Sequence, residues 1–487
     1  MTPLAYTSAA SGPAPADWTA LKTDLQGHLV RPGDASYNLD KELYDPRFDG
    51  LTPAGIAYCA TFQDVQACLA FSRKFGVQVA ARSGGHSYAG WSSCAGLIID
   101  VTRMNVVKLS GTTAEIGSGA KLIDVYSGLA AHGRAIPGGS CPTVGIAGLT
   151  LGGGIGVTGR AHGLTCDNLT SVDVVVADGT VYQATPTQHA DLFWACQGGG
   201  GGNFGVVTQF TFSTFATTPI LTFFLRWNWS QAADVVRGWQ SWAPTAPDAL
   251  WSNLHLSAAT HGSEGVTVGG TYLGSESALL TLLGKLYSAV GPHPFEAIVT
   301  PHSSYLDAML YEAGCSGETV AACRLPSQGP SGTFPRVPQY AKSDFFNRPL
   351  TSAGIGTMLT WIEKFPPVAG AAGGSGGIAL DALGGAINRV SPSATAFVHR
   401  TSLFDAQYTT NWSSGTGGTG AANQHAWLRS FWTAMRPYAS GQAYQNYIDP
   451  DLTTNWRSAY YGANTTRLEA VKKAYDPTRI FRFPQGF

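Results

Sequence analysis

The pattern of apolar and polar positions divides the chain into two regions of different character. Between residues 55 and 215, short runs of β-branched residues alternate with amphipathic stretches and with three glycine-rich segments. The periodicity predicts helices over 64–76 and 122–133, each closed by a glycine, with strands before and after them. We therefore expect an α+β domain whose glycine-rich loops are directed toward one ligand.

After about residue 218, alternating strands dominate and helical stretches separate them. Strands are predicted at 221–229, 250–257, 266–273, 295–300 and 377–390. A helix is predicted over 230–243, with Val235, Trp239 and Trp242 on one face. A tryptophan stripe of this kind can stack on a sugar, but the helical spacing favours core packing. This region is expected to be a second domain, an antiparallel sheet covered by helices.

The composition of the chain excludes several classes of function. A chain of 487 residues is long enough for two or three domains. Its formal net charge is -1 and charged residues make up 13% of it, which excludes a nucleic-acid footprint and a basic membrane-binding face. No apolar run reaches the roughly 18 residues that span a bilayer. We expect a protein whose partner is a small molecule.

The cysteines suggest disulfides and not a metal site. None of the eight forms a CxxC motif or a His/Cys cluster at metal spacing, so zinc is not expected. Two closely spaced pairs, Cys59 with Cys68 and Cys315 with Cys323, suit an exported protein. Spacing alone does not fix which cysteines pair.

The remaining cysteines leave a thiol for chemistry. If Cys166 and Cys196 form a third pair, Cys94 and Cys141 are left over, and one of these has a chemical role. The stretch after Met1 is rich in Ala, Ser and Pro, without a charged start or an apolar core. We expect a secreted protein whose leader is absent from this sequence, while an intracellular location stays open.

The glycine-rich segment 138–156, GGSCPTVGIAGLTLGGGIG, is the most informative stretch. Glycine adopts positive φ and has no side chain, so such a segment can place bare backbone against a flat or charged ligand. It is interpreted either as a cofactor cradle or as a surface loop with a buried Cys141.

A second glycine loop follows the strand predicted at 77–81. Its sequence, RSGGHS at 82–87, could bind a pyrophosphate through backbone N–H groups and the Arg82 guanidinium. Neither this loop nor the 138–156 segment has the GxGxxG pattern followed by a convincing helix, so we reject a Rossmann nicotinamide site. An isolated GGH would otherwise indicate a hydrogen-bonding loop histidine at His86.

The motifs taken together resemble a known family. Eight motifs occur in the following order over most of the chain: RSGGHSYAGWS, GGSCPTVGIAGLTLGGGIG, LFWACQGGGGGNFGVVTQF, KSDFF, GGAINRV, FVHR, NYIDPD and YYGANTTRLEAVKKAYDP. In this set the chain resembles the berberine bridge enzyme-like flavoprotein oxidases of the vanillyl-alcohol oxidase/PCMH superfamily. The resemblance implies an FAD-binding domain over 1–217 with a PCMH-type core at about 50–215. It further implies an α/β substrate-binding domain over 218–440 and a C-terminal segment, 441–487, that returns to the FAD domain.

The resemblance also implies FAD attached twice to the protein. His86 would bond through an imidazole nitrogen to the flavin 8α-methyl, and Cys141 through sulfur to flavin C6. A neutral imidazole and a thiolate are nucleophiles suited to the electrophilic edge of an oxidised flavin. The family's FAD contacts fall on Arg82, Ser83, Gly84, Gly85, His86, Ser87, Cys141, Val144, Gly145, Gly148, Leu149, Ile155, Val206 and Tyr447. Val144 occupies the position that controls oxygen access in the family and resembles the oxygen-reactive members.

The candidate catalytic residues come from the same resemblance. Tyr447 matches the family's active-site tyrosine, which as a base would need a nearby positive charge or hydrogen-bond donor, because a free phenol has a pKa near 10. Asn388 falls about where alkaloid-cyclising members have an acidic base, which weakens a cyclase interpretation. Leu383 replaces the second tyrosine of the antibiotic-tailoring members. The other candidates are Tyr444, Tyr88, Asp381 and His399.

The resulting hypothesis is an FAD oxidase that takes a hydride from an alcohol or hemiacetal carbon, plausibly of a saccharide, and reduces O2 to H2O2. One alternative is a tailoring oxidase or oxidative cyclase that acts on a glycosylated or polyphenolic secondary metabolite. An alternative of another class is a secreted flavin-bearing binding protein with little activity.

Overall fold

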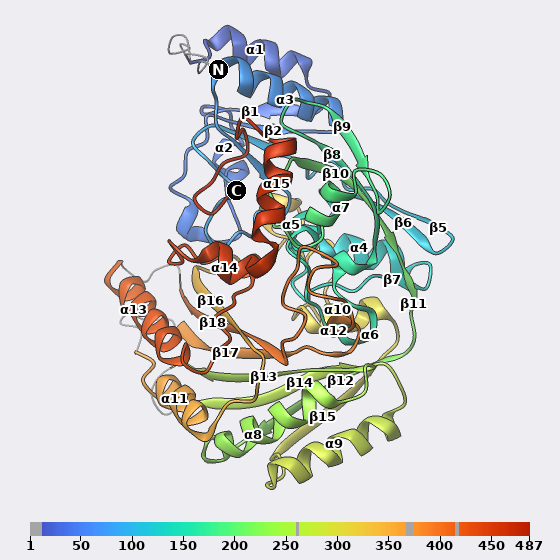
Figure 1. The fold of residues 1–487 in the computed structure, drawn as a ribbon, viewed down its shortest axis with the longest axis vertical. Helices are drawn as coiled ribbons and strands as arrows, with labels where there is room; N and C mark the ends of the chain where they lie inside the picture. Colours follow the sequence, from blue (N-terminus) through green and yellow to red (C-terminus); the bar gives the residue numbers. More distant parts are fainter. Residues whose placement is uncertain (1–11, 260–262, 367–373, 414–417) are drawn as a thin grey trace.

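The structure is a computed structural model that describes residues 12–259, 263–366, 374–413 and 418–487. It has the expected α+β class, with one part built around two small sheets and another around one large antiparallel sheet (Figure 1). The predicted boundary at residue 217 falls between strand β11 (Phe215–Ala216) and strand β12 (Ile220–Trp227). Among the described residues, no helix combines the length and apolar character needed to cross a membrane.

The first part contains a mixed four-stranded sheet that delivers the first glycine loop. Its order is β1 (His28–Val30), β2 (Gly55–Tyr58), β4 (Leu97–Asp100), β3 (Val79–Arg82), and both β2 and β3 run parallel to β4. Helix α3 (Phe62–Phe75) connects β2 to β3 and confirms the predicted helix. It begins at Thr61, whose side chain accepts from Asp64 N, and ends at Gly76 with φ +66°. The loop 82–87 therefore starts where β3 ends.

An antiparallel five-stranded sheet completes this part. Its order is β5 (Val107–Ser110), β6 (Thr113–Gly117), β10 (Val206–Ser213), β8 (Leu169–Val175), β9 (Val181–Ala184). Three helices and a short strand pair belong to the same part: α4 (Leu122–Ala130), α5 (Ile146–Leu151) and α7 (Ala190–Ala195), with β7 (Arg134–Ala135) paired to β11. The 138–156 segment thus contains one short helix, α5, whose N-cap is Gly145. The third glycine cluster lies between α7 and β10.

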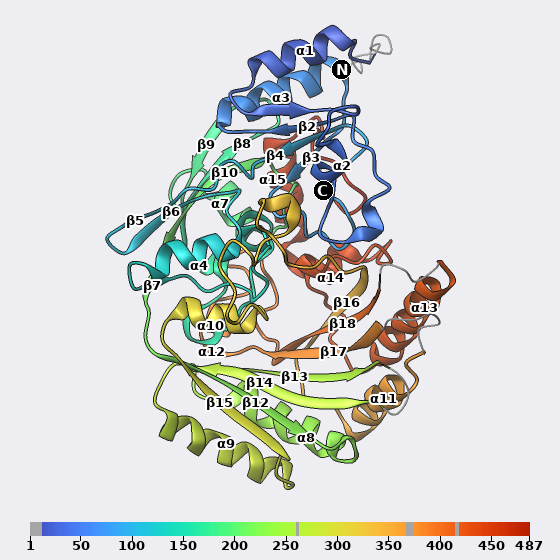
Figure 2. The same cartoon turned by 180° about the vertical axis from the view of Figure 1, so that it is seen from behind.

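The second part is a seven-stranded antiparallel sheet. Its order is β15 (Glu296–His302), β12, β14 (Gly265–Tyr272), β13 (Leu250–Ala258), β17 (Gly374–Ala382), β18 (Phe404–Trp412), β16 (Gln339–Phe346). Helices cover its outer face, as Figures 1 and 2 show: α8 (Ala232–Trp242), α9 (Glu276–Val290), α11 (Ser352–Glu363) and α13 (Gly418–Met435). Its other face is directed toward the first part.

The alternation of side chains explains the two faces of this sheet. Leu254, Leu380 and Tyr408 are buried in one core with the covering helices, and Trp239 of α8 is fully buried there. This confirms that the tryptophan stripe packs the core. Successive residues of a strand point to opposite faces, so partly exposed residues such as Gln407 face the first part.

One predicted strand is too long. The strand expected over 377–390 ends at Ala382, and residues 385–389 form helix α12 (Gly385–Arg389). Gly384 and Gly385 have φ of +101° and +55°, a conformation that breaks a strand. A Cβ on Gly385 would lie 2.3 Å from Arg160 O, so close packing requires glycine there.

The C-terminal segment returns to the first part. It contains a 3-10 turn, η6 (Gln445–Tyr447), and helices α14 (Trp456–Tyr461) and α15 (Thr465–Tyr475). Val79 of β3 forms a parallel bridge with Phe481. Lys472 Nζ donates to Asn203 O at 2.7 Å, beside the third glycine cluster. Residues far apart in sequence therefore meet around the glycine loops (Figure 1).

The cysteines only partly follow the prediction. Cys315 and Cys323 form the expected disulfide. The pair Cys59 and Cys68 was a wrong prediction, because both are free thiols whose sulfurs lie 3.9 Å apart in a contact that is not a bond. Both are fully buried among apolar side chains and pack there as small hydrophobic residues. The conditional pair of Cys166 and Cys196 is likewise two free, buried cysteines.

Candidate active site

A cavity of about 520 Å³ lies between the three glycine loops, the sheet of the second part and the C-terminal segment. Its size is that of an ordinary ligand site. All of the predicted cofactor contacts line it except Ile155. Ile155 lies nearby in the same loop, where its backbone N donates to Tyr444 Oη at 3.2 Å.

The glycines of the cavity have two separate uses. A Cβ on Gly84 would lie 2.2 Å from Gly145 N, so the first two glycine loops pack backbone against backbone. A Cβ on Gly148, in contrast, would meet nothing within 4 Å although Gly148 lines the cavity. A side chain at position 148 would therefore occupy ligand space. The cradle with its backbone N–H groups and apolar walls fits a flat, phosphate-bearing cofactor such as FAD.

Arg82 lines the cavity, but part of its guanidinium is bound to protein side chains. Its Nε donates to Asp100 Oδ2 at 2.5 Å, and its Nη2 lies 3.4 Å from Tyr58 Oη. Both charged side chains are nearly fully buried. This ion pair holds β3 to β4. Among the described residues Nη1 has no hydrogen-bond partner, so it could still bind an anion together with the backbone N–H groups of the 82–87 loop.

His86 is held in place on two sides. Its Nε2 lies 2.8 Å from Thr143 Oγ1, and its ring stacks on Tyr44 at 4.2 Å between centroids. Burial and the nearby Lys121 ammonium lower the pKa of His86 to about 3. The imidazole is consequently neutral at physiological pH, which is the form that can act as a nucleophile.

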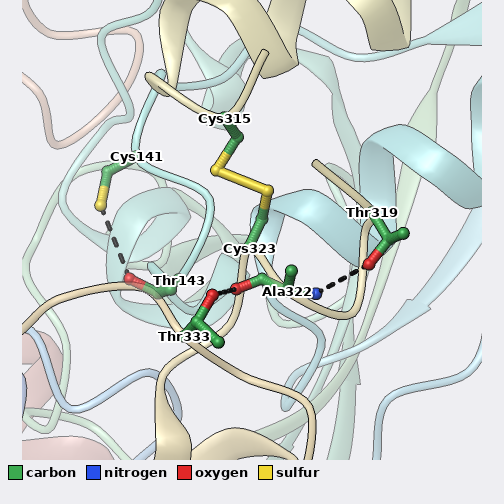
Figure 3. Close-up of a disulfide and its surroundings, with 7 residues drawn as sticks. All are labelled: Cys141, Thr143, Cys315, Thr319, Ala322, Cys323 and Thr333. Carbon is green, nitrogen blue, oxygen red and sulfur yellow. Dashed lines mark hydrogen bonds between the residues drawn. A yellow bond between two sulfur atoms is a disulfide. The ribbon is translucent and has the colours of Figure 1, made fainter. Parts of the chain in front are cut away.

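Cys141 shares the same neighbour. Its Sγ lies 3.6 Å from Thr143 Oγ1, as Figure 3 shows. Burial raises the pKa of Cys141, while hydrogen bonds from Thr143 act in the opposite direction. The disulfide Cys315–Cys323 lies close by and belongs to a segment of the second part (Figure 3). One hydroxyl thus contacts both proposed attachment residues.

Two tyrosines stand on the cavity wall. The rings of Tyr88 and Tyr447 stack at 5.7 Å between centroids. Gln407 of β18 donates from Nε2 to Tyr88 Oη at 2.7 Å. Burial, together with the carboxyl groups of Asp405 and Asp381, raises the pKa of Tyr447 well above its ordinary value. Tyr447 is therefore a neutral phenol, and the acidic groups beside it are the opposite of what a tyrosinate needs.

The two carboxyl groups beside Tyr447 form a cross-strand pair. Asp381 of β17 lies directly opposite Asp405 of β18, a position that puts Cβ atoms roughly 5 Å apart. Burial raises the pKa of Asp381 to about 7, and that of Asp405 well above its ordinary value. Glu312 of α10 (Tyr305–Glu312) also faces Asp381, and burial raises its pKa to about 7. This cluster holds protons at neutral pH.

The other catalytic candidates have structural partners. The Tyr444 hydroxyl accepts from Gly154 N at 3.0 Å, from Ile155 N at 3.2 Å and from Asn446 Nδ2 at 2.9 Å. Tyr444 is almost fully buried. It therefore fastens the C-terminal segment to the 138–156 loop.

Asn388 and His399 do not line the cavity. Asn388 Nδ2 donates to Ser402 O at 2.8 Å, and its Oδ1 accepts from Gly384 N. His399 is fully buried and stacks on Phe345 at 4.0 Å. Asn388 therefore ties the turn at Gly384 to Ser402, and His399 packs as a buried ring beside Phe345.

Several cavity residues were not predicted. Tyr44, Gln339, Gln407 and Thr409 line the wall, and Thr143 lies behind His86 and Cys141. Gln407 and Thr409 are alternate residues of β18, so period-2 polarity in 404–412 could have indicated them. Tyr44 is in an irregular stretch without any such signal. Within the described residues, no group of three or more His, Cys, Asp or Glu could hold a metal ion.

The sequence is similar to those of known proteins. Residues 53–185 match the FAD binding domain family, and residues 443–487 match the family described as berberine and berberine like. An uncharacterised FAD-linked oxidoreductase of Bacillus subtilis is 33% identical, covering 96% of this chain and 97% of its own. The chitooligosaccharide oxidase of Gibberella zeae is 31% identical, covering 93% and 91%.

The fold is also shared. The solved structure of BBE-like 1 from Physcomitrella patens has a TM-score of 0.86 and 31% identity, covering 96% of this chain and 98% of that one. The likeness spans both parts of the structure and the C-terminal segment.

Proposed function

The chain belongs to the berberine bridge enzyme-like family of FAD-linked oxidoreductases, and from this premise we propose that it is a saccharide oxidase. It takes a hydride from an alcohol or hemiacetal carbon and passes the electrons through FAD to O2, which gives H2O2. The observation that carries the proposal is the composition of one cavity wall. His86, Cys141 and Tyr447 all line the cavity, although they come from three separate segments.

The proposal includes covalent attachment of FAD to both His86 and Cys141. The neutral imidazole supports the first bond, and the partly exposed thiol at the same cavity supports the second. Bound FAD would supply the hydride acceptor, and the glycine loops would hold its phosphates through backbone N–H groups. The chain itself supplies the walls, the attachment atoms and the proton acceptors.

In the proposed mechanism, Tyr447 and the carboxyl groups of Asp381 and Asp405 remove the proton of the substrate hydroxyl. A neutral phenol can accept a proton only if it gives up its own. The ionised member of the pair Asp381 and Asp405 is a suitable acceptor, since both groups are near enough to raise the pKa of Tyr447. The proton would pass from the substrate oxygen to Tyr447 Oη and from there to Asp381. In this scheme Asn388 and Tyr444 have no part in proton transfer.

The polar wall supports a hydroxyl-rich substrate. Gln339, Gln407 and Thr409 line the cavity from the second part, and Tyr88 adds an aromatic surface with a fixed hydroxyl. Such groups orient a ligand through hydrogen bonds. The chitooligosaccharide oxidase of Gibberella zeae is named for a substrate of this kind.

Two further parts of the proposal concern oxygen and location. Val144 lines the cavity between Cys141 and Gly145, the N-cap of α5, and in the proposal its small side chain gives O2 access to the flavin. The disulfide Cys315–Cys323 supports folding in an oxidising compartment and therefore secretion.

The test combines three measurements on the purified holoprotein. Acid precipitation shows whether the yellow flavin stays with the polypeptide, and His86→Ala with Cys141→Ala should release it. Anaerobic mixing with a panel of oligosaccharides should bleach the flavin, and readmitted O2 should restore it with formation of H2O2. Flavin freed from wild type would overturn covalent attachment. Bleaching only by phenolic or glycosylated metabolites would favour the tailoring oxidase, and no bleaching at all would favour a binding protein.

A further inference from the structure

We propose that the Thr143 hydroxyl is a positioning group that prepares both His86 and Cys141 for bonding to the flavin. The inference rests on the proposed double attachment and deepens it. The segment 141–145 presents Cys141 to the cavity and keeps Thr143 behind it. Thr143 is fully buried, so its hydroxyl has no access to bulk water.

The geometry centres on one oxygen atom. Thr143 Oγ1 lies 2.8 Å from His86 Nε2 and 3.6 Å from Cys141 Sγ. The backbone is fixed as well, because Thr143 O accepts from Gln328 Nε2 at 3.1 Å. Gln328 follows the disulfide Cys315–Cys323 in the same connection between α10 and β16. A crosslinked segment of the second part therefore holds Thr143 in place.

A count of donors and acceptors shows in which direction the Thr143 hydroxyl donates its proton. A hydroxyl has one proton to donate and two lone pairs that accept. His86 is neutral, so one ring nitrogen carries a proton and the other a lone pair. When Nε2–H donates to Oγ1, the Thr143 proton is free to point at Cys141 Sγ. Two hydrogen bonds in series result: His86 Nε2–H donates to Thr143 Oγ1, and Thr143 Oγ1–H donates to Cys141 Sγ. Each proton is then donated once.

This arrangement prepares the imidazole. With the proton on Nε2, the lone pair is on Nδ1, which becomes the nucleophilic atom of the ring. The stack on Tyr44 fixes the plane of the His86 ring. The hydrogen bond to Thr143 fixes how the ring is turned within that plane. The flavin 8α carbon would thus meet one defined nitrogen.

The same hydroxyl prepares the thiol. Burial raises the pKa of Cys141, which disfavours the reactive thiolate. A donated O–H stabilises the thiolate and offsets part of that penalty. Lys121, whose Nζ donates to Ser83 O and Gly119 O, contributes a positive charge near His86 and keeps it neutral.

The covalent chemistry balances with O2 as oxidant. Each new bond replaces one flavin C–H hydrogen and one protein hydrogen, from the His86 ring N–H or the Cys141 S–H. For each bond, two electrons and these two hydrogens pass to one O2 molecule, which is reduced to H2O2. No other reactant is required, because the proposed activity already supplies O2 as the electron acceptor.

The experiment measures attachment and not turnover. Thr143→Val removes the hydroxyl while keeping the shape, and Thr143→Ser keeps the hydroxyl. Each is combined with His86→Ala, which isolates the sulfur bond, and with Cys141→Ala, which isolates the nitrogen bond. Denatured proteins from matched expression times are analysed by intact mass and by mapping of the flavin peptides. Thr150→Val is the matched control, because Thr150 is buried in the adjacent helix α5 and, among the described residues, its Oγ1 has no partner.

We expect Thr143→Val to lower the rate of covalent attachment about tenfold or more at each site, the scale of a lost hydrogen bond to a charged or reactive group. Thr143→Ser should restore it, and Thr150→Val should match wild type. Attachment by Thr143→Val as fast as wild type at both sites would overturn the inference.

Other outcomes are also decisive. If Thr143→Val fails to bind FAD even without a covalent bond, Thr143→Ser decides: normal attachment supports the hydroxyl, and slow attachment overturns it. Wild type that carries no covalent flavin would contradict the proposed double attachment itself. That failure is distinguishable because it appears without any change at Thr143.

Discussion

The rings of Tyr88 and Tyr447 lie nearly parallel, with 12° between their planes and 5.7 Å between their centroids. Their hydroxyls have different surroundings. Tyr88 Oη accepts from Gln407 Nε2, whereas Tyr447 faces the carboxyl groups of Asp405 and Asp381. Two similar side chains on one wall are therefore suited to different tasks, substrate contact for Tyr88 and proton transfer for Tyr447.

Replacing Tyr447 by Phe should slow flavin reduction by about 10² or more, the usual loss when a general base is removed. Tyr88→Phe is the matched control and should slow it far less, because it removes a hydroxyl that does not take the proton. Stopped-flow bleaching under anaerobic conditions measures both rates. Equal losses in the two variants would reassign the proton acceptor.

The pH dependence of flavin reduction should follow Asp381. Its pKa is raised to about 7, so the carboxyl group becomes an ionised proton acceptor only as the pH rises through that value. We expect the rate of reduction to fall below pH 7 in wild type. Asp381→Asn should remove this acidic limb and lower the plateau by about 10². A wild-type profile that is flat from pH 5 to 9 would contradict the role of Asp381.

The same substitution should stabilise the protein at high pH. The folded-state pKa of Asp381 is raised, so an unfolded chain binds fewer protons than the folded one between pH 4 and 7. Stability is therefore lost as the pH rises through this window and stays low above it. Asp381→Asn should raise Tm more at pH 8 than at pH 5, as measured by thermal unfolding. A shift in Tm that is the same at both pH values in Asp381→Asn would refute the linkage.

Tyr444→Phe should destabilise the protein without changing the pH profile. Gly154 N and Ile155 N lose their acceptor in a buried loop, which costs about 1–3 kcal/mol for each unsatisfied group. Tyr438→Phe is the control, since its hydroxyl makes one long contact, 3.4 Å to Thr357 Oγ1. Urea unfolding compares the two free energies. A Tyr444→Phe variant as stable as Tyr438→Phe would show that the loop finds other partners.

Much of the first part could be predicted because its signals are local. The helix over 64–76 has its cap, its apolar face and its closing glycine within the sequence of the helix itself. Gly84 and Gly145 are glycines because two loops touch there, and their clustering was visible in the sequence. His86 and Cys141 lie at the same cavity because their two loops meet.

The features that were missed depend on contacts between distant segments. The register that sets Asp381 opposite Asp405 follows from strand pairing and has no local signature. The ion pair between Arg82 and Asp100 joins two strands and likewise has no local signature. Cys59 and Cys68 are near in sequence, but the apolar core between β2 and α3 holds them as free thiols. The raised pKa of Tyr447 likewise depends on carboxyl groups that approach it only when β17 and β18 pair.

The return of the C-terminal segment has a consequence for biosynthesis. Tyr447, Phe481 and Pro484 line the cavity that begins with residues 78–88. Proteins are made from the N-terminus, so the glycine loops emerge from the ribosome long before the wall that closes over them. A complete cavity can therefore exist only after translation has passed residue 484. We therefore expect cofactor capture in the finished site to be a post-translational event, and a nonsense codon before residue 447 to remove the wall that closes over the glycine loops.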